Sequence, residues 1–240
     1  MTENQLFQRL QTQLAALIEQ TPPGQRLPSE PDLARQLGVS RATLREAMRA
    51  FEAQGQIRRR QGVGTFVVAA AGVMETGLEV LESIETLAKR IQLPVSLGAM
   101  AVNPITADAL QAENLRVAEG TPLVEVSRTI LTADRPVAYL IDLLPQEYLL
   151  PEDLKSGFSG SVLDVLLQRG SPLLSRSVAQ IQAVSAKPQI AKKLQIQRGD
   201  VLLLLEAQLY GADGRIVDYS HSYFIPGHFR FHVVRRVGTA

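Results

Sequence analysis

Apolar residues recur every three or four positions at the start of the chain. Between residues 3 and 20 they fall on one stripe, which predicts an amphipathic helix that ends before the Thr21-Pro22-Pro23-Gly24 stretch. The stripe consists of Leu6, Leu10, Leu14, Leu17 and Ile18. We expect this helix to pack its stripe against the elements that follow it.

A shorter helix is predicted after residue 29. Ser29 occupies an N-cap position, and Leu33 and Leu37 give the helix its apolar stripe. Gly38 follows the last apolar residue, as is typical of a helix C-terminus. The chain therefore turns at this glycine before another helix begins.

The next helix has two distinct faces. It begins after Ser40, whose hydroxyl can cap it, and it ends at Gly55. One face is apolar and predicted to be buried, and it carries Leu44, Ala47, Met48 and Phe51. Another face carries Arg41, Arg45 and Arg49, which repel one another by roughly a few tenths of a kcal/mol per pair. A polyanion would relieve that repulsion, although the arginine row alone favours an ordinary solvated helix face.

A basic hairpin is predicted directly after these helices. Residues 57–67 form two short strands around a Gly62-Val63-Gly64 turn, and Arg58, Arg59 and Arg60 lead into that turn. Two helices joined by a tight turn and followed by such a hairpin form a winged helix-turn-helix, whose second helix enters the DNA major groove. We therefore predict a DNA-binding domain over residues 1–68.

The remainder is predicted to be a second domain that contains an internal duplication. Small residues suggest a linker over residues 69–76, a helix is predicted over 75–90, and the domain extends over 77–237. Residues 114–120 match residues 193–199, and each copy predicts a helix, a glycine turn and two strands joined by a hairpin. The strand at 122–131 should pair with 136–144, and the strand at 201–210 with 216–224. A further helix is predicted over 161–169, so the expected fold is α+β, with one antiparallel sheet covered by helices.

Charge is distributed unevenly between the two halves. Residues 1–67 hold nine arginines, no lysine and six acidic residues, a net charge of +3, whereas residues 68–240 hold 16 basic and 18 acidic residues. The basic half is the winged-helix half, as DNA binding requires. The chain has no cysteine, no apolar run long enough to span a membrane and a polar start without a signal peptide, so we expect a cytoplasmic protein.

No catalytic or metal site is predicted. His221, His228 and His232 lie within twelve residues of one another, but strand alternation directs His221 away from Asp218, and no closely spaced ligand pair is present. The carboxylates are scattered along the chain, and none of the common nucleotide-binding or hydrolase motifs occurs. We expect no cofactor.

Residues 27–67 resemble the winged-helix domain of the GntR family of bacterial transcription regulators. The resemblance rests on Leu27-Pro28-Ser29-Glu30, on Val39 to Ala47 and on Gly62 to Val67, which stand in the family's order and spacing. It implies DNA contacts by Ser40, Arg41, Thr43, Arg45, Arg58, Arg60, Gln61 and Gly62. Arg41 and Arg45, in the N-terminal half of the helix that follows Ser40, would read bases. The hydroxyls of Ser40 and Thr43 would contact phosphates, and Gln61 and Gly62 at the tip of the hairpin would enter the minor groove. For Arg59, a phosphate contact and a solvated side chain remain equally open.

The second half is similar to the UTRA domain, the effector-binding module of the HutC branch of that family. The similarity rests on Arg128, on residues 136–145, on Gly160-Ser161 and on residues 212–231. It implies a fold like that of chorismate lyase, an effector pocket on the sheet and a homodimer. The effector-binding positions it implies are Ser83, Arg128, Leu140, Ser161, Asp218 and Phe224.

Half of the pocket positions that are polar in relatives binding phosphorylated sugars are apolar here. Ile130, Leu140, Leu163 and Phe224 have lost the polar group, and Arg128 is the one arginine that remains. A phosphate is best held by several convergent donors. We therefore expect a less charged and more apolar ligand, such as a carboxylate or a small hydrophobic metabolite, with a pocket that binds nothing specific as the alternative.

Together these features predict a transcription regulator, most simply a repressor. A homodimer would bind a palindromic operator in double-stranded DNA, and a small-molecule effector in the second domain would release it or modulate its binding. Two alternatives remain open: a chorismate-lyase-like enzyme fused to a vestigial DNA-binding domain, and a DNA-binding protein that responds to no effector.

Overall fold

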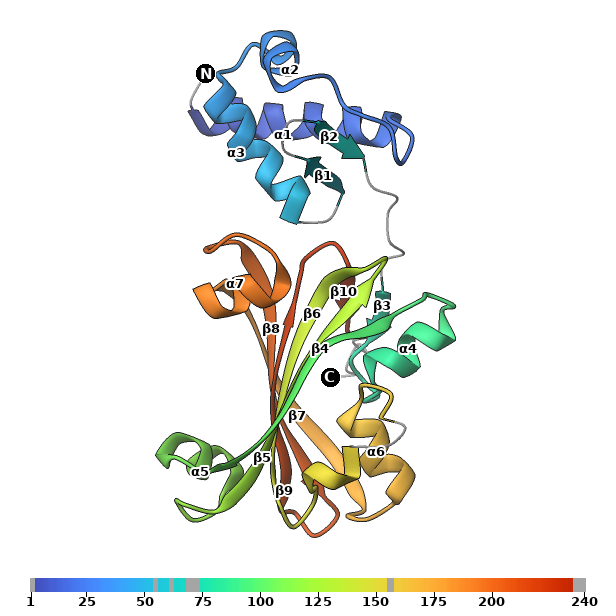
Figure 1. Cartoon of the computed structure of the whole chain (residues 1–240), viewed down its shortest axis with the longest axis vertical. Coiled ribbons are helices and arrows are strands. Elements are labelled where there is room, and N and C mark those ends of the chain that lie inside the picture. Colours follow the sequence, from blue (N-terminus) through green and yellow to red (C-terminus); the bar gives the residue numbers. More distant parts are fainter. Residues whose placement is uncertain (1–2, 54–55, 61–62, 68–73, 155–157, 235–240) are drawn as a thin grey trace, which may run out of the picture. The chain divides into compact units, whose positions relative to one another are not determined.

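The chain forms two compact units, the second of which begins at Met74. The computed structural model describes residues 3–53, 56–60, 63–67, 74–154 and 158–234 (Figure 1). Each unit has its own hydrophobic core, so each is described separately.

The first unit contains three helices and a two-stranded hairpin. These elements are α1 (Glu3–Gln20), α2 (Glu30–Leu37), α3 (Arg41–Ala53), β1 (Ile57–Arg60) and β2 (Gly64–Val67). The N-terminal helix, the helix-turn-helix and the hairpin that the sequence predicted are all confirmed. The expected end of α3 at Gly55 lies outside the described residues.

Local signals in the sequence account for the helix boundaries. The Ser29 hydroxyl accepts a hydrogen bond from the Asp32 N–H at the start of α2, and Gly38 ends that helix with φ +66°. The predicted apolar face of α3 is buried against α1 and α2, with Leu44 and Ala47 fully inaccessible to solvent. Burial of a leucine of this kind contributes roughly 1.5–3 kcal/mol.

The second unit is built on a six-stranded antiparallel sheet in the order β4-β5-β6-β9-β8-β7, with a separate parallel pair formed by β3 and β10. Its elements are β3 (Met74–Gly77), α4 (Ile84–Arg90), β4 (Ser96–Thr106), α5 (Ala109–Leu115), β5 (Pro122–Thr132), β6 (Arg135–Pro145), η1 (Pro151–Leu154), α6 (Val162–Arg169), β7 (Leu174–Ser185), α7 (Pro188–Leu194), β8 (Val201–Gly211), β9 (Ile216–Phe224) and β10 (Phe229–His232). The predicted α+β class and both predicted hairpins are confirmed.

The duplication is visible in the register of the strands. Val102 pairs with Val126 between β4 and β5, and the residues 79 positions later, Ile181 and Leu205, pair in the same way between β7 and β8. Each copy thus begins one strand earlier than the sequence indicated. The two additional strands, β4 and β7, form the edges of the sheet and are exposed on both faces, so they lack the alternation that identifies a half-buried strand.

Two expectations for the start of the second unit are wrong. The helix predicted over 75–90 is helical only from Ile84, and the linker predicted over 69–76 has its last three residues in strand β3. Met74 and Thr76 are buried while Glu75 is exposed, which is strand alternation. The strand forms because β10, more than 150 residues later, pairs with it, and a local periodicity cannot reveal such a partner. Residues 69–73 of the expected linker lie outside the described residues.

Helices cover the two faces of the six-stranded sheet differently. Helices α4 and α6 lie on one face, and α5 and α7 lie on the other, near its two ends (Figure 1). On the face covered by α4 and α6, Leu87 of α4 packs near Ile130, and Leu166 of α6 packs near Val124. The predicted effector positions are on the strands and helix starts of that same face. No helix among the described residues is long and apolar enough to cross a membrane.

Candidate functional sites

The exposed side of α3 carries the arginines that the sequence singled out. Arg41 and Arg45 are exposed, whereas Leu44 and Met48 of the same helix are buried. The helix is therefore held by its apolar face and presents its basic face outward. Guanidinium groups on such a helix have the geometry that pairs with guanine in the major groove.

Glu30, the first residue of α2, connects α3 to the hairpin, and the sequence indicated it only as part of the Leu27-Pro28-Ser29-Glu30 segment. Its Oε2 accepts a hydrogen bond from Arg45 Nε over 2.7 Å, and its Oε1 lies 3.4 Å from Arg59 Nε. Arg59 is thus turned back onto the helices in the free protein, and its contact with a DNA phosphate stays a prediction. The side chain of Arg45 remains 58% exposed and accessible to a ligand.

Ser40 and Thr43 lie together at the start of α3. The Thr43 N–H donates to Ser40 Oγ over 3.1 Å, and the two hydroxyl oxygens are 2.8 Å apart. Ser40 is exposed, so its hydroxyl can reach a phosphate as well as cap the helix.

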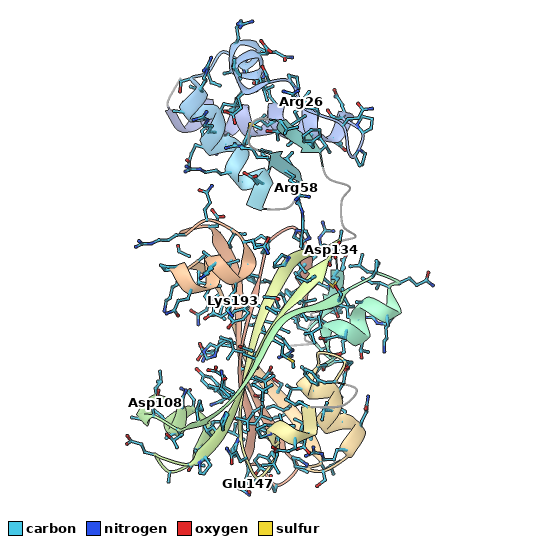
Figure 2. All side chains as sticks on the ribbon, viewed as in Figure 1. Arg26, Arg58, Asp108, Asp134, Glu147 and Lys193 are labelled. Atoms are coloured by element: carbon cyan, nitrogen blue, oxygen red, sulfur yellow. The ribbon has the colours of Figure 1, made fainter. Side chains whose placement is uncertain are left out.

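Of the residues predicted in the hairpin, the structure describes the side chain of Arg58, and it also shows Arg26 packed against the hairpin. Arg58 is exposed on β1 (Figure 2). Gln61, Gly62 and the side chain of Arg60 lie outside the described part of the chain. The exposed Arg26 packs against Gly64, whose φ of +136° and missing side chain leave room for that guanidinium. Arg26 precedes the Leu-Pro-Ser-Glu segment and belongs to no periodic pattern, which is why the sequence did not reveal it.

The second unit brings the starts of α4 and α6 together around one carboxylate. Ser83 caps α4 and Ser161 caps α6, and both serines are buried. The Ser83 hydroxyl donates to Asp164 Oδ2 over 2.7 Å, and the Thr86 hydroxyl approaches the same oxygen at 3.3 Å. The Asp164 N–H in turn donates to Ser161 Oγ over 2.9 Å. The predicted residues Ser83 and Ser161 are therefore joined through Asp164, which the sequence analysis did not name.

A buried ion pair lies on the sheet beside these helix starts. Arg128 of β5 donates to Asp142 of β6, and both residues are buried. Asp218 of β9 is also buried and accepts a hydrogen bond from the Leu143 N–H over 3.2 Å. Burial, with a smaller effect of nearby Asp142, raises the pKa of Asp218 well above its ordinary value of 3.8.

The two remaining predicted positions are apolar and belong to one buried hydrophobic cluster. Leu140 pairs directly opposite Arg128 in the β5–β6 register and is buried. Phe224 contacts the rings of Phe229 and Phe231 at centroid distances of 4.6 and 5.1 Å. Leu140 therefore borders the polar group, and Phe224 packs against the aromatic rings of strand β10.

Glu85, in the first turn of α4, links the two polar groups. It is only 8% exposed, and neither carboxylate oxygen has a hydrogen-bond partner in another described residue. Burial raises its pKa, its own backbone N–H opposes that shift, and the charges of Arg128, Asp164 and Asp142 also act on it. Its position two residues after Ser83 was the only signal in the sequence. We refer to Ser83, Glu85, Arg128, Asp142, Ser161, Asp164 and Asp218 as the polar cluster.

The polar cluster corrects the expectation of scattered carboxylates. Glu85, Asp142, Asp164 and Asp218 come from four different elements and affect one another electrostatically. Even so, no group of three or more His, Cys, Asp or Glu side chains in the described ranges is arranged to hold a metal ion.

Two family models match the chain. Residues 2–67 match "Bacterial regulatory proteins, gntR family", and residues 99–230 match the UTRA domain. The histidine utilization repressor of Pseudomonas aeruginosa is 30% identical over 229 residues, covering 92% of this chain and 87% of that protein. The HTH-type transcriptional repressor NagR of Bacillus subtilis is 28% identical and covers 95% and 91% of the two chains.

The fold agrees with that of a solved structure. The crystal structure of PhnF from Mycobacterium smegmatis matches with a TM-score of 0.62 and 22% identity, over 95% of this chain and all of that one. The curated relatives are transcription regulators, so the relationship gives no support to the enzyme alternative. The chain belongs to the gntR family of bacterial regulatory proteins, in the HutC branch that carries a UTRA domain, and is a transcription regulator.

Proposed function

We propose that this regulator is a repressor that binds a palindromic operator as a homodimer, with Arg41 and Arg45 of α3 contacting base edges. The observation that carries the proposal is the arrangement of α3, whose apolar face is buried while both arginines face outward. A single such helix covers one half-site, and a two-fold dimer covers a palindrome. Ser40, Thr43, Arg58 and Arg60 would contact phosphates, and Gln61 and Gly62 would enter the minor groove.

The second unit would bind the effector at the polar cluster and beside Leu140. Binding there is proposed to lower operator affinity, and by linkage the operator must lower effector affinity by the same factor. The support is the burial of polar groups at one place on the sheet, next to the starts of two helices. Burial of a polar group costs free energy unless the group is hydrogen-bonded, and a ligand can supply a partner where the chain does not.

The DNA-binding proposal is tested by selecting fragmented genomic DNA from the source organism with the full-length protein. The wild type should enrich a short palindrome, Arg45→Ala should lose it, and Arg230→Ala should retain it, because Arg230 is an exposed arginine of the second unit. Recovery of the same unpatterned DNA by all three proteins would refute the role of α3. Light scattering of the free protein should give the mass of two chains, and a monomer would refute the dimer.

A further inference from the structure

The polar cluster has already used the donors that an anionic ligand would need. The hydroxyls of Ser83 and Thr86 both point to Asp164, so the chain's own carboxylate occupies the place between the two helix starts. The guanidinium of Arg128 is paired with Asp142. The buried Nε of Arg128 has no hydrogen-bond partner among the described residues. With the guanidinium paired and both hydroxyls directed at Asp164, the cluster does not offer the convergent set of donors that holds a phosphate.

The charge of the polar cluster is negative. Arg128 is its one cation, against Asp142 and Asp164, even when both Glu85 and Asp218 keep their protons. An additional anion would be repelled at close range in this poorly solvated position, whereas a cation would be attracted. The balance of charge therefore favours a ligand with a positive group.

The Glu85 carboxylate would accept hydrogen bonds from such a positive group. The side chain is more than nine-tenths buried, and neither of its oxygens accepts a hydrogen bond from another described residue. A buried carboxylate in this state is costly, and N–H donors supplied by a ligand would remove that cost.

A glycine lies directly against this carboxylate. Gly160 has φ +108°, and a Cβ at this position would come within 2.8 Å of Glu85 Oε1 and 3.5 Å of Leu97 Cδ1. The apolar side chain of Leu140 lies opposite Arg128 in the β5–β6 register. A ligand that approaches Glu85 would therefore place a polar head at the carboxylate and an apolar part against these leucines.

We propose that the effector is a small organic cation with N–H donors, an amine, amidine or guanidine on an apolar body, and that Glu85 receives its charged head. The proposal rests on the proposed effector function of the second unit. It replaces the carboxylate or purely hydrophobic ligand that the sequence favoured, because Glu85, Asp142 and Asp164 together change the charge of the site.

The test compares ligands that differ only in their head group. The full-length protein is titrated by calorimetry with n-butylammonium, n-butylguanidinium, valerate and n-butyl phosphate at pH 7 and constant ionic strength. We expect one or both cations to bind at least tenfold more tightly than valerate and butyl phosphate. Stronger binding of either anion, or no binding of both cations, would overturn the proposal without reference to any variant.

Variants then locate the binding. Glu85→Gln should weaken binding of the preferred cation at least tenfold, and Glu147→Gln should leave it unchanged, because Glu147 forms an exposed ion pair with Arg215. Equal binding by wild type and Glu85→Gln would refute the role of Glu85. Selection of a palindrome from genomic DNA is independent of these ligands, so a failure of the cation proposal can be distinguished from a failure of the proposed DNA-binding function.

Discussion

Glu30 Oε2 accepts a hydrogen bond from Arg45 Nε over 2.7 Å, which joins the first residue of α2 to the exposed face of α3. The same carboxylate lies 3.4 Å from Arg59 Nε on β1. Arg45 is therefore oriented before DNA arrives, and part of the basic charge of the surface is neutralised in the free protein. Recognition of a base by Arg45 has to compete with this ion pair or take place with the pair intact.

Glu30→Gln should bind unrelated DNA up to about fivefold more tightly and discriminate less well between operator and scrambled duplexes. The reason is that a partly exposed ion pair contributes up to about 1 kcal/mol, and its loss frees two arginines for non-specific phosphate contacts. Fluorescence anisotropy with both duplexes at one salt concentration measures the ratio. Glu46→Gln is the matched control, since it removes one charge from the exposed pair with Arg49. An equal loss of discrimination in both variants would show that net charge, rather than the position of Arg45, is responsible.

Arg58→Ala should weaken binding to operator and scrambled DNA by similar factors. An exposed arginine that contacts only phosphate carries no sequence information. Its removal should reduce the slope of log K against log salt by about 1. A change in the preferred sequence, with the slope unaltered, would assign Arg58 to the bases instead.

Ser40→Asp separates the two roles of the residue at the start of α3. Aspartate caps a helix as well as serine does, so thermal stability should stay within about 0.5 kcal/mol of the wild type. A carboxylate repels phosphate, so DNA affinity should fall at least tenfold. Ser40→Ala provides the contrast, because it removes the cap at a cost of about 1 kcal/mol without adding charge. Unchanged affinity in Ser40→Asp would place the phosphate away from Ser40.

Asp218→Asn should raise the free energy of unfolding at neutral pH. Burial raises the pKa of Asp218 in the folded state, so the wild type loses stability as the pH rises from its ordinary pKa toward the raised one. The gain from the substitution should be absent below about pH 4, where folded and unfolded chains are both protonated, and should grow above it. The asparagine oxygen can still accept the Leu143 N–H. Urea unfolding between pH 4 and 8 measures the effect.

Asp153→Asn provides a matched control of opposite sign. The Leu150 N–H, with a smaller effect of Arg169, lowers the pKa of Asp153, so its contribution to stability is present above the ordinary pKa and lost as the pH falls. The asparagine variant should therefore be less stable than wild type at neutral pH, with the difference vanishing in acid. If both variants shifted stability in the same direction at neutral pH, the raised pKa assigned to Asp218 would be wrong.

Helices and hairpins that depend on interactions between residues close in the chain could be predicted from the sequence alone. Caps at Ser29 and Ser40, the left-handed turn at Gly38 and the apolar face of α3 are all encoded within a few residues, and the predicted helices formed there. The duplicated hairpins were visible for the same reason, since each pairs with a neighbour one turn away.

Strands and side-chain contacts that need a partner far away in the chain became visible only in the folded structure. Strand β3 exists because β10 pairs with it, and the edge strands β4 and β7 are defined by their pairing and not by a buried face. The polar cluster is of the same kind: Glu85, Asp142 and Asp164 belong to no pattern where they occur in the chain, and they come together, with Glu85 desolvated, only when two helix starts meet the sheet. Electrostatic interactions act across space irrespective of sequence separation, so the chemistry of the effector site follows from the fold.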